Sequence, residues 1–213
     1  VTLSTSLHDE YYDEKLDWEK CDSGLECAKV TVPLNWEKPS ADSVQVALIK
    51  HKATGARDGS LLVDPGGPGE SGVELVDYGV DNAVDSTVAK HYDVIGFDPR
   101  GVGLSAPAIT CLSDSQQDAY LYAPTVGAVG SKPWIADEEK RAKTLADACA
   151  TNTGPLIAHV DTVNAAHDMD VVRAALGEKK LNYLGYSYGT YLGAVYAGLY
   201  PKNVGRMVFD GPY

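Results

Sequence analysis

Ser187 stands at the centre of the segment Gly185-Tyr186-Ser187-Tyr188-Gly189, which has the spacing G-x-S-x-G. A short apolar run, 181–184, precedes this segment, and a stretch with helical character, 188–200, follows it. A sharp turn from a strand into a helix strains the central residue and crowds the residues two before and two after it, so both must be small. The pattern predicts that Ser187 is a nucleophile at a helix N-terminus, where partial positive charge favours a developing anion.

Acyl transfer from such a serine also needs two N–H donors for the oxygen that becomes negative in the tetrahedral intermediate. The backbone N–H of Tyr188, the residue after the nucleophile, is the expected first donor. The second is expected from the glycine-rich segment 64–72, DPGGPGESG, and we choose Gly67. This segment lacks the spacings of phosphate-binding loops, and Glu70 would repel a phosphate. Glu70 is instead a candidate anchor for the free amine of a substrate.

The segments around these motifs predict an α/β fold, with a mostly parallel sheet flanked by helices. Alternating apolar and polar residues predict a leading pair of strands over 28–34 and 44–52. Continuous apolar runs are typical of strands that are covered on both faces, and their alternation with helical segments indicates parallel pairing. The further strands are expected at 61–63, 92–97, 181–184 and 206–209, and the helices at 72–78, 84–90, 137–149, 161–176 and 188–200.

The composition narrows the classes of partner. The chain has 18 Lys plus Arg against 30 Asp plus Glu, a formal net charge of -12. A phosphate backbone would be repelled overall, so nucleic acid is not an expected partner. No apolar run approaches the roughly 18 residues that span a bilayer, so no membrane span is expected. Neither a CxxC spacing nor a nearby His pair is present, and we predict no metal and no cofactor.

Cys21, Cys27, Cys111 and Cys149 are the four cysteines, and they allow three disulfide pairings. The spacing favours Cys21 with Cys27 and Cys111 with Cys149, but it does not exclude the other two pairings or a set of buried free thiols. This use of cysteine points to a secreted, extracellular protein. Arg100, in a glycine-rich loop after the fourth expected strand, is predicted to tie loops together through carboxylate or carbonyl hydrogen bonds.

Four blocks of sequence together resemble the secreted tripeptidyl aminopeptidases of actinobacteria, which are relatives of the proline iminopeptidases. The blocks are LLVDPGGPGESG, YDVIGFDPRGVGLS, LNYLGYSYGTYLG and VGRMVFDGP, and the resemblance runs from about Cys21 to the end. It implies an α/β-hydrolase fold, Ser187 as nucleophile, and an oxyanion hole from Gly67 and Tyr188. The implied activity is release of tripeptides from unblocked N-termini. Pro65 stands where proline iminopeptidases have His, which favours the tripeptidyl branch.

Histidine is missing where the nucleophile's partners are expected. The order of the triad in α/β-hydrolases is Ser, then Asp or Glu, then His, and no His follows Ser187. We therefore expect residues 1–213 to be the N-terminal part of one catalytic domain, with 1–20 as a surface arm and truncation after about the sixth strand. A C-terminal segment, as a second chain or a missing part, would supply the lid, the acid and the His. The chain alone is expected to be inactive.

Groups within the chain are poor substitutes for that missing acid and His. Asp210 suits turn formation better than the role of triad acid. His159, which precedes an expected helix, is the least unsuitable of the five histidines, the others being His8, His51, His91 and His167.

Two other functions remain open at this stage. A secreted carboxylesterase or lipase would use the same nucleophile and oxyanion hole, and a preference for esters over peptides with a free amine would distinguish it. A non-catalytic binding protein would keep the fold without turnover. The intact G-x-S-x-G segment and glycine-rich loop argue against that reading, because binding does not require a strained serine.

Overall fold

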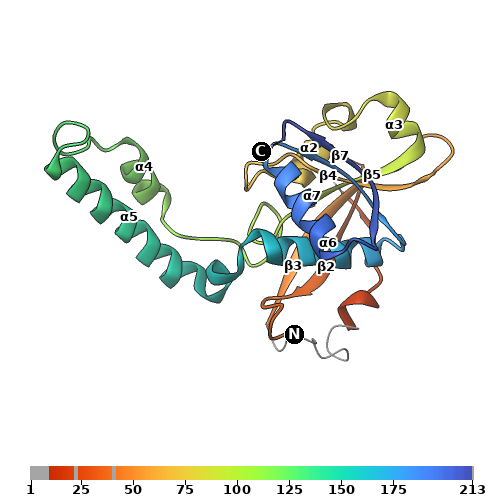
Figure 1. The fold of residues 1–213 in the computed structure, drawn as a ribbon, viewed down its shortest axis with the longest axis horizontal. Helices are drawn as coiled ribbons and strands as arrows, with labels where there is room; N and C mark the ends of the chain where they lie inside the picture. The colour runs from red at the N-terminus through yellow and green to blue at the C-terminus, as the bar shows by residue number, and fades with distance from the viewer. Residues whose placement is uncertain (1–9, 22–23, 40–41, 213) are drawn as a thin grey trace. The chain divides into compact units, whose positions relative to one another are not determined.

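The computed structural model describes residues 10–21, 24–39 and 42–212. These residues form two compact units, which we describe separately. Unit 1 comprises the described residues up to Pro107 together with those from His159 onward, and unit 2 comprises Ala108–Ala158. Unit 1 contains the sheet and the candidate site, and unit 2 is helical (Figure 1).

Seven strands of unit 1 form one mixed sheet in the order β1-β2-β3-β5-β4-β6-β7. The first four strands in this order pair antiparallel, and β5, β4, β6 and β7 pair parallel. The predicted sheet with flanking helices is therefore confirmed, with an antiparallel N-terminal part. The strands are β1 (Glu19–Lys20), β2 (Glu26–Pro33), β3 (Ser43–His51), β4 (Gly59–Asp64), β5 (Tyr92–Asp98), β6 (Leu181–Tyr186) and β7 (Val204–Asp210).

The helices of unit 1 cover both faces of this sheet. The segments α2 (Gly72–Asp77), η1 (Val80–Asn82) and α3 (Ser86–His91) belong to the crossover from β4 to β5, and α2 packs on β5 and β3. The helices α6 (Thr162–Ala175) and α7 (Tyr188–Leu199) pack on each other, α7 contacts β6 and β7, and α6 contacts β2. The bounds of α2, α3, α6 and α7 lie within a few residues of the predicted ranges. The sequence sets these bounds because each helix has an N-cap residue before it or a Gly or Pro after it.

The core is divided between the two faces by strand alternation. On the face of α2 and α3, Ile49 and Val63 belong to one cluster of buried residues with Val73 and Val76 of α2. The partners on the opposite face include Leu62, Ile95 and Tyr183, which are neighbours in the ladder and are completely or almost completely buried. Residues that alternate in the strands therefore contact different helices, as the period of two requires.

Residues 10–20 contact residues of unit 1 that lie further along the chain. Tyr11 is buried and its ring centroid lies 6.5 Å from that of Trp36. Glu14 accepts hydrogen bonds from the backbone N–H and the hydroxyl of Thr31, at 2.8 and 3.0 Å. Residues 19–20 form β1, an edge strand that the polar sequence did not predict, so the described residues contain seven strands. His8 lies outside the described residues.

Arg100 has the tying role that was predicted for it. Its guanidinium is almost completely buried and donates two hydrogen bonds to the Asp168 carboxylate, at 2.7 and 2.6 Å. It also donates to the backbone carbonyls of Leu34 at 2.8 Å, Pro33 at 3.1 Å and His159 at 3.1 Å. One buried cation thereby joins the β2–β3 connection, the loop after β5, and α6.

Unit 2 consists of α4 (Asp114–Tyr122), α5 (Lys132–Thr153) and η2 (Gly154–His159), the last of which crosses into unit 1. The prediction for 137–149 was too short: α5 begins at Lys132, because the Ser131 hydroxyl caps it and Pro133 is tolerated in the first turn. The helix α4 was not predicted at all. Neither α4 nor α5 buries a side chain completely, although all their residues are described.

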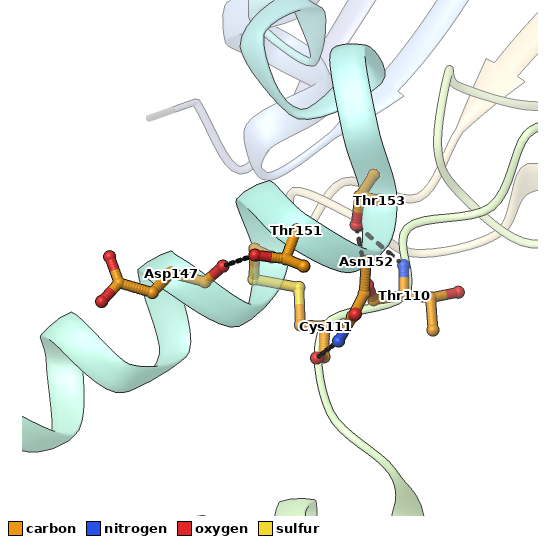
Figure 2. Close-up of a disulfide and its surroundings, with 7 residues drawn as sticks. Thr110, Cys111, Asp147, Thr151, Asn152 and Thr153 are labelled. Atoms are coloured by element: carbon orange, nitrogen blue, oxygen red, sulfur yellow. Dashed lines mark hydrogen bonds between the residues drawn. A yellow bond between two sulfur atoms is a disulfide. The ribbon is translucent and has the colours of Figure 1, made fainter.

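Two disulfides join Cys21 to Cys27 and Cys111 to Cys149, which is the pairing that the spacing favours. The second lies within unit 2 and connects the start of the unit to the last turns of α5 (Figure 2). Next to it, the Asn152 amide donates to the Cys111 carbonyl at 2.7 Å, and the Thr153 hydroxyl donates to the Thr110 carbonyl at 2.9 Å. A disulfide and local hydrogen bonds thus connect the start of unit 2 to the C-terminal end of α5.

Candidate active site

Ser187 occupies a strained turn between β6 and α7. Its φ of 50° makes it the one non-glycine residue with positive φ among those described, and its ψ is -120°. The residue is exposed, and its backbone N–H donates to the Asp210 carbonyl at 2.9 Å. On the other side, the N–H and hydroxyl of Thr190 both donate to the Ser187 carbonyl, at 2.9 and 2.7 Å. The surrounding backbone therefore holds this serine in a conformation that costs of order 1–3 kcal/mol.

The two glycines of the motif are required by space. A Cβ on Gly185 would lie 2.4 Å from the Gly189 carbonyl oxygen. A Cβ on Gly189 would lie 2.8 Å from Asp64 Oδ1 and 2.9 Å from the Asp64 carbonyl oxygen. The end of β4, the end of β6 and the start of α7 therefore approach one another at van der Waals contact, which is the crowding that the sequence motif predicts.

The glycine-rich loop after β4 lies directly against this turn. Gly66 is buried, and a Cβ on it would lie 2.6 Å from the Tyr186 carbonyl oxygen, 3.0 Å from Tyr188 N and 3.2 Å from Ser187 Cβ. Gly67, the chosen donor, is the next residue and is exposed, with φ +104°. Tyr188 is the first residue of α7, so its N–H has no partner within the helix. Two separate loops thus bring main-chain groups to the same serine, and Gly66 is the contact that the sequence did not single out.

Asp98, at the end of β5, connects the glycine-rich loop to the loop after β5. Its carboxylate accepts hydrogen bonds from the Ser71 hydroxyl at 2.5 Å and from the Val73 N–H at 3.1 Å. The other oxygen accepts from the Leu104 N–H at 2.8 Å. Ser71 is in turn the N-cap of α2, where its hydroxyl accepts from the Glu74 N–H. The loop that faces Ser187 is therefore anchored at its C-terminal end by a buried carboxylate.

Asp64 is the buried acid at the other end of the glycine-rich loop, and the sequence motifs gave it no role. It is 2% exposed, and its Oδ1 has no hydrogen-bond partner. Burial raises the pKa of Asp64 to about 7, opposed by a hydrogen bond from the Gly66 N–H and reinforced by the charge of Glu70. The only sequence signal was an acid that ends a continuous apolar strand, LLVD.

The tyrosines around Ser187 are fixed by hydrogen bonds. The Tyr183 hydroxyl donates to the Gly189 carbonyl at 2.8 Å, and the Tyr186 hydroxyl donates to the Ala83 carbonyl at 2.6 Å. The Tyr188 and Thr162 hydroxyls lie 2.7 Å apart, which joins the start of α7 to the start of α6. Burial raises the pKa of Tyr188, and the charge of Asp64 adds to this shift. These phenols stay protonated at neutral pH and serve as positioning groups.

The remaining predicted residues lie as follows. Glu70 is exposed, at the turn closed by its own N–H and the Gly66 carbonyl. His167 is on α6 with its Nδ1 2.5 Å from the Tyr200 hydroxyl, and the hydrogen bonds among described residues join no histidine to the Ser187 hydroxyl. Asp210 contributes its carbonyl to the turn at Ser187. Within the described part of the chain, no group of three or more His, Cys, Asp or Glu could hold a metal, and no helix is long and apolar enough to cross a bilayer.

Residues 59–213 match the protein-family model for the α/β-hydrolase fold. The matched residues include β4, the glycine-rich loop and the turn at Ser187. The chain belongs to the α/β-hydrolase family. A crystal structure of a hydrolytic enzyme from Pseudomonas aeruginosa superposes on this α/β-hydrolase with a TM-score of 0.51. The match covers 87% of this chain and 41% of that chain at 16% identity, so it supports the fold alone.

Curated relatives of this α/β-hydrolase include peptidases. The chain is 45% identical over 206 residues to the tripeptidyl aminopeptidase of Streptomyces lividans, covering 92% of this chain and 38% of the relative. It is 42% identical over 208 residues to the serine protease Hip1 of Mycobacterium tuberculosis, and this match covers 93% of this chain and 39% of Hip1. It is also 42% identical over 150 residues to carboxylesterase B of the same species, and this match covers 70% of this chain and 28% of the esterase. The resemblance to tripeptidyl aminopeptidases is thereby confirmed, and the chain spans about two-fifths of the length of these peptidases.

Proposed function

We propose that this chain carries the nucleophile and the oxyanion hole of a secreted serine exopeptidase that releases tripeptides from free N-termini. Ser187 is the nucleophile, and the N–H groups of Gly67 and Tyr188 bind the oxyanion. The triad acid and His come from a C-terminal segment, as a second chain or as further sequence. The single observation that carries this proposal is the exposed Ser187, held at positive φ against a glycine-rich loop.

The chemistry follows from that geometry. Ser187 Oγ attacks the carbonyl carbon of the third residue of the substrate, and its proton passes to the His of the C-terminal segment. The C–N bond then breaks, the amine leaves with that proton, and the tripeptide remains as an ester on Ser187. Water hydrolyses the ester. The oxygen that is negative in both tetrahedral intermediates would lie between the loop after β4 and the start of α7, where N–H donors are worth about 2.7–4 kcal/mol each.

Identity to a tripeptidyl aminopeptidase and a serine protease supports the choice of a peptide substrate. The two disulfides support an oxidising, extracellular location. Glu70 is retained as the proposed anchor for the substrate's free amine, because it is exposed on the loop that faces Ser187.

Hydrolysis of a tripeptide arylamide by the complete hydrolase tests this proposal. We expect cleavage of the substrate with a free N-terminus, little cleavage of its acetylated form, and loss of activity in Ser187→Ala. Ser86→Ala is the matched control, because Ser86 is also an exposed serine at the start of a helix. Activity that survives in Ser187→Ala would overturn the assignment of the nucleophile. If Glu70→Gln keeps the full preference for free N-termini, Glu70 is not the amine anchor.

A secreted carboxylesterase is the second candidate, and the identity to carboxylesterase B supports it. Ester and amide hydrolysis use the same serine and the same oxyanion hole, so the substrate decides between them. An aryl ester cleaved well while both forms of the tripeptide arylamide are refused would favour the esterase.

A further inference from the structure

Asp64 is a buried acid that the proposed chemistry does not use. It is the last residue of β4, where it pairs in the ladder with Gly185, two residues before Ser187. Gly189, two residues after Ser187, has its Cα so close that an added Cβ would lie 2.8 Å from Asp64 Oδ1. Asp64 therefore contacts both sides of the turn that holds Ser187.

The same residue contacts the start of the glycine-rich loop. The Gly66 N–H lies near the Asp64 side chain, where it lowers the pKa of that carboxyl, and Gly66 itself lies against Ser187 and Tyr188 N. The carboxyl group thus lies between the loop and the turn, and its Oδ1 faces the start of α7 without a hydrogen-bond partner. An ionised carboxylate that is buried with an unpartnered oxygen costs far more free energy than the neutral acid in the same place.

We propose that Asp64 is a positioning residue that holds the glycine-rich loop against the turn at Ser187, and that it does so as the uncharged acid. The inference rests on the proposed function, since it assigns a purpose to the contact between the two halves of the oxyanion hole. A negative charge here would lie beside the start of α7, whose Tyr188 N–H is a proposed oxyanion donor, and would oppose the charge that develops there.

The described ionisable groups around Asp64 are a carboxylate and two phenols. Glu70 follows on the same loop, and its negative charge raises the pKa of Asp64 further beyond the effect of burial. Tyr183 on β6 and Tyr188 on α7 face it from the other elements, and the pKa of each is raised by burial and then by the charge of Asp64. Because no cation is among these groups, only the Gly66 N–H and the start of α7 favour an ionised Asp64, and neither carries a full positive charge.

The first test is the pH dependence of unfolding, compared between the wild type and Asp64→Asn. The pKa of Asp64 rises from its ordinary 3.8 in the unfolded chain to about 7 in the folded one. Its contribution to stability is thus complete below pH 4 and is lost as pH rises through 7. We expect the unfolding constant of the wild type, relative to Asp64→Asn, to increase on the order of 100- to 1000-fold between pH 4 and pH 8.

The matched control is Asp77→Asn, which removes an exposed carboxylate at the end of α2. Its stability relative to the wild type is expected to stay constant over the same range. If Asp64→Asn behaves like this control, the proposal is wrong. A carbon-13 NMR titration of the Asp64 carboxyl in the wild type gives the same information should the variant fail to fold. A midpoint near pH 7 supports the proposal, and a midpoint below pH 5 overturns it.

The second test separates positioning from mere burial, using the pH profile of the complete hydrolase. In the wild type, kcat/KM for the tripeptide arylamide should fall above about pH 7 as Asp64 ionises. Asp64→Asn keeps an acceptor for the Gly66 N–H and cannot ionise, so this alkaline fall should be absent. Asp64→Ala loses the acceptor, and kcat should drop at every pH while KM changes little.

Equal profiles for the wild type and Asp64→Asn, or equal kcat for the Asn and Ala variants, would overturn the positioning role. These failures are distinguishable from failure of the proposed function. If Ser187→Ala keeps its activity, the nucleophile is wrong, but the unfolding and NMR measurements on Asp64 remain valid because neither depends on catalysis.

Discussion

The candidate site of unit 1 is held by buried polar contacts, whereas α4 and α5 of unit 2 have no completely buried side chain. Asp64 and Asp98, at the two ends of the glycine-rich loop, and Arg100, in the loop after β5, are each almost completely buried, and Asp98 and Arg100 hydrogen-bond several loops. In unit 2 the corresponding support is the disulfide Cys111–Cys149 and the hydrogen bonds beside it (Figure 2). The comparison indicates that unit 1 fixes its geometry by packing and unit 2 by a covalent link.

The largest expected effect comes from the buried ion pair of unit 1. Arg100→Ala leaves the Asp168 carboxylate buried without its cation and should lower the free energy of unfolding by about 3–5 kcal/mol. The matched change in unit 2 is Lys143→Ala, which breaks the exposed pair with Asp147 on α5 and should cost less than about 0.5 kcal/mol. Urea denaturation of both variants checks the comparison, and equal losses would contradict it.

Removal of the unit 2 disulfide is expected to have the next largest effect, confined to that unit. Cys111 and Cys149 are 38 residues apart, for which chain entropy predicts a loss of about 4 kcal/mol in the double Cys→Ser variant. Hydrogen exchange should show lost protection in α5 and unchanged protection in β4, β5 and β6. The control is the Cys21–Cys27 pair, whose separation of 6 residues predicts only about 2 kcal/mol. Loss of hydrogen-exchange protection in the sheet would show that the stability of unit 1 depends on the disulfide of unit 2, which would contradict the comparison.

The smallest of these effects is the difference in stability between two glycine substitutions, which measures the contact between the glycine-rich loop and the turn at Ser187. Gly66 and Gly69 have nearly the same φ, +103° and +102°, but only Gly66 has neighbours within 4 Å of an added Cβ. Gly69→Ala should therefore cost about 1–2 kcal/mol for backbone strain alone, and Gly66→Ala about 1–3 kcal/mol more. Thermal unfolding of the two variants measures the difference, and the absence of one would mean that the loop does not press on the turn.

Prediction from the sequence succeeded where burial and backbone geometry constrain residue type. Strands β2 to β7 and the turn at Ser187 were predictable because alternating apolar residues, continuous apolar runs and paired glycines have few other uses. The helix α4 and the first turn of α5 were missed, since their residues remain exposed and carry no clear apolar stripe. The packing of Gly66 and the unpartnered oxygen of Asp64 depend on two segments, 64–66 and 185–189, that are distant in sequence, and local patterns do not contain that information.

The most direct test of the central claim is to locate the adduct of a fluorophosphonate probe by peptide mass spectrometry. In the complete hydrolase, we expect one adduct, on the peptide that contains Ser187, in the wild type and in Ser86→Ala but not in Ser187→Ala. The 213-residue chain alone should react weakly, since it lacks a His that follows Ser187. An adduct on another residue, or strong labelling of the chain alone, would contradict the account.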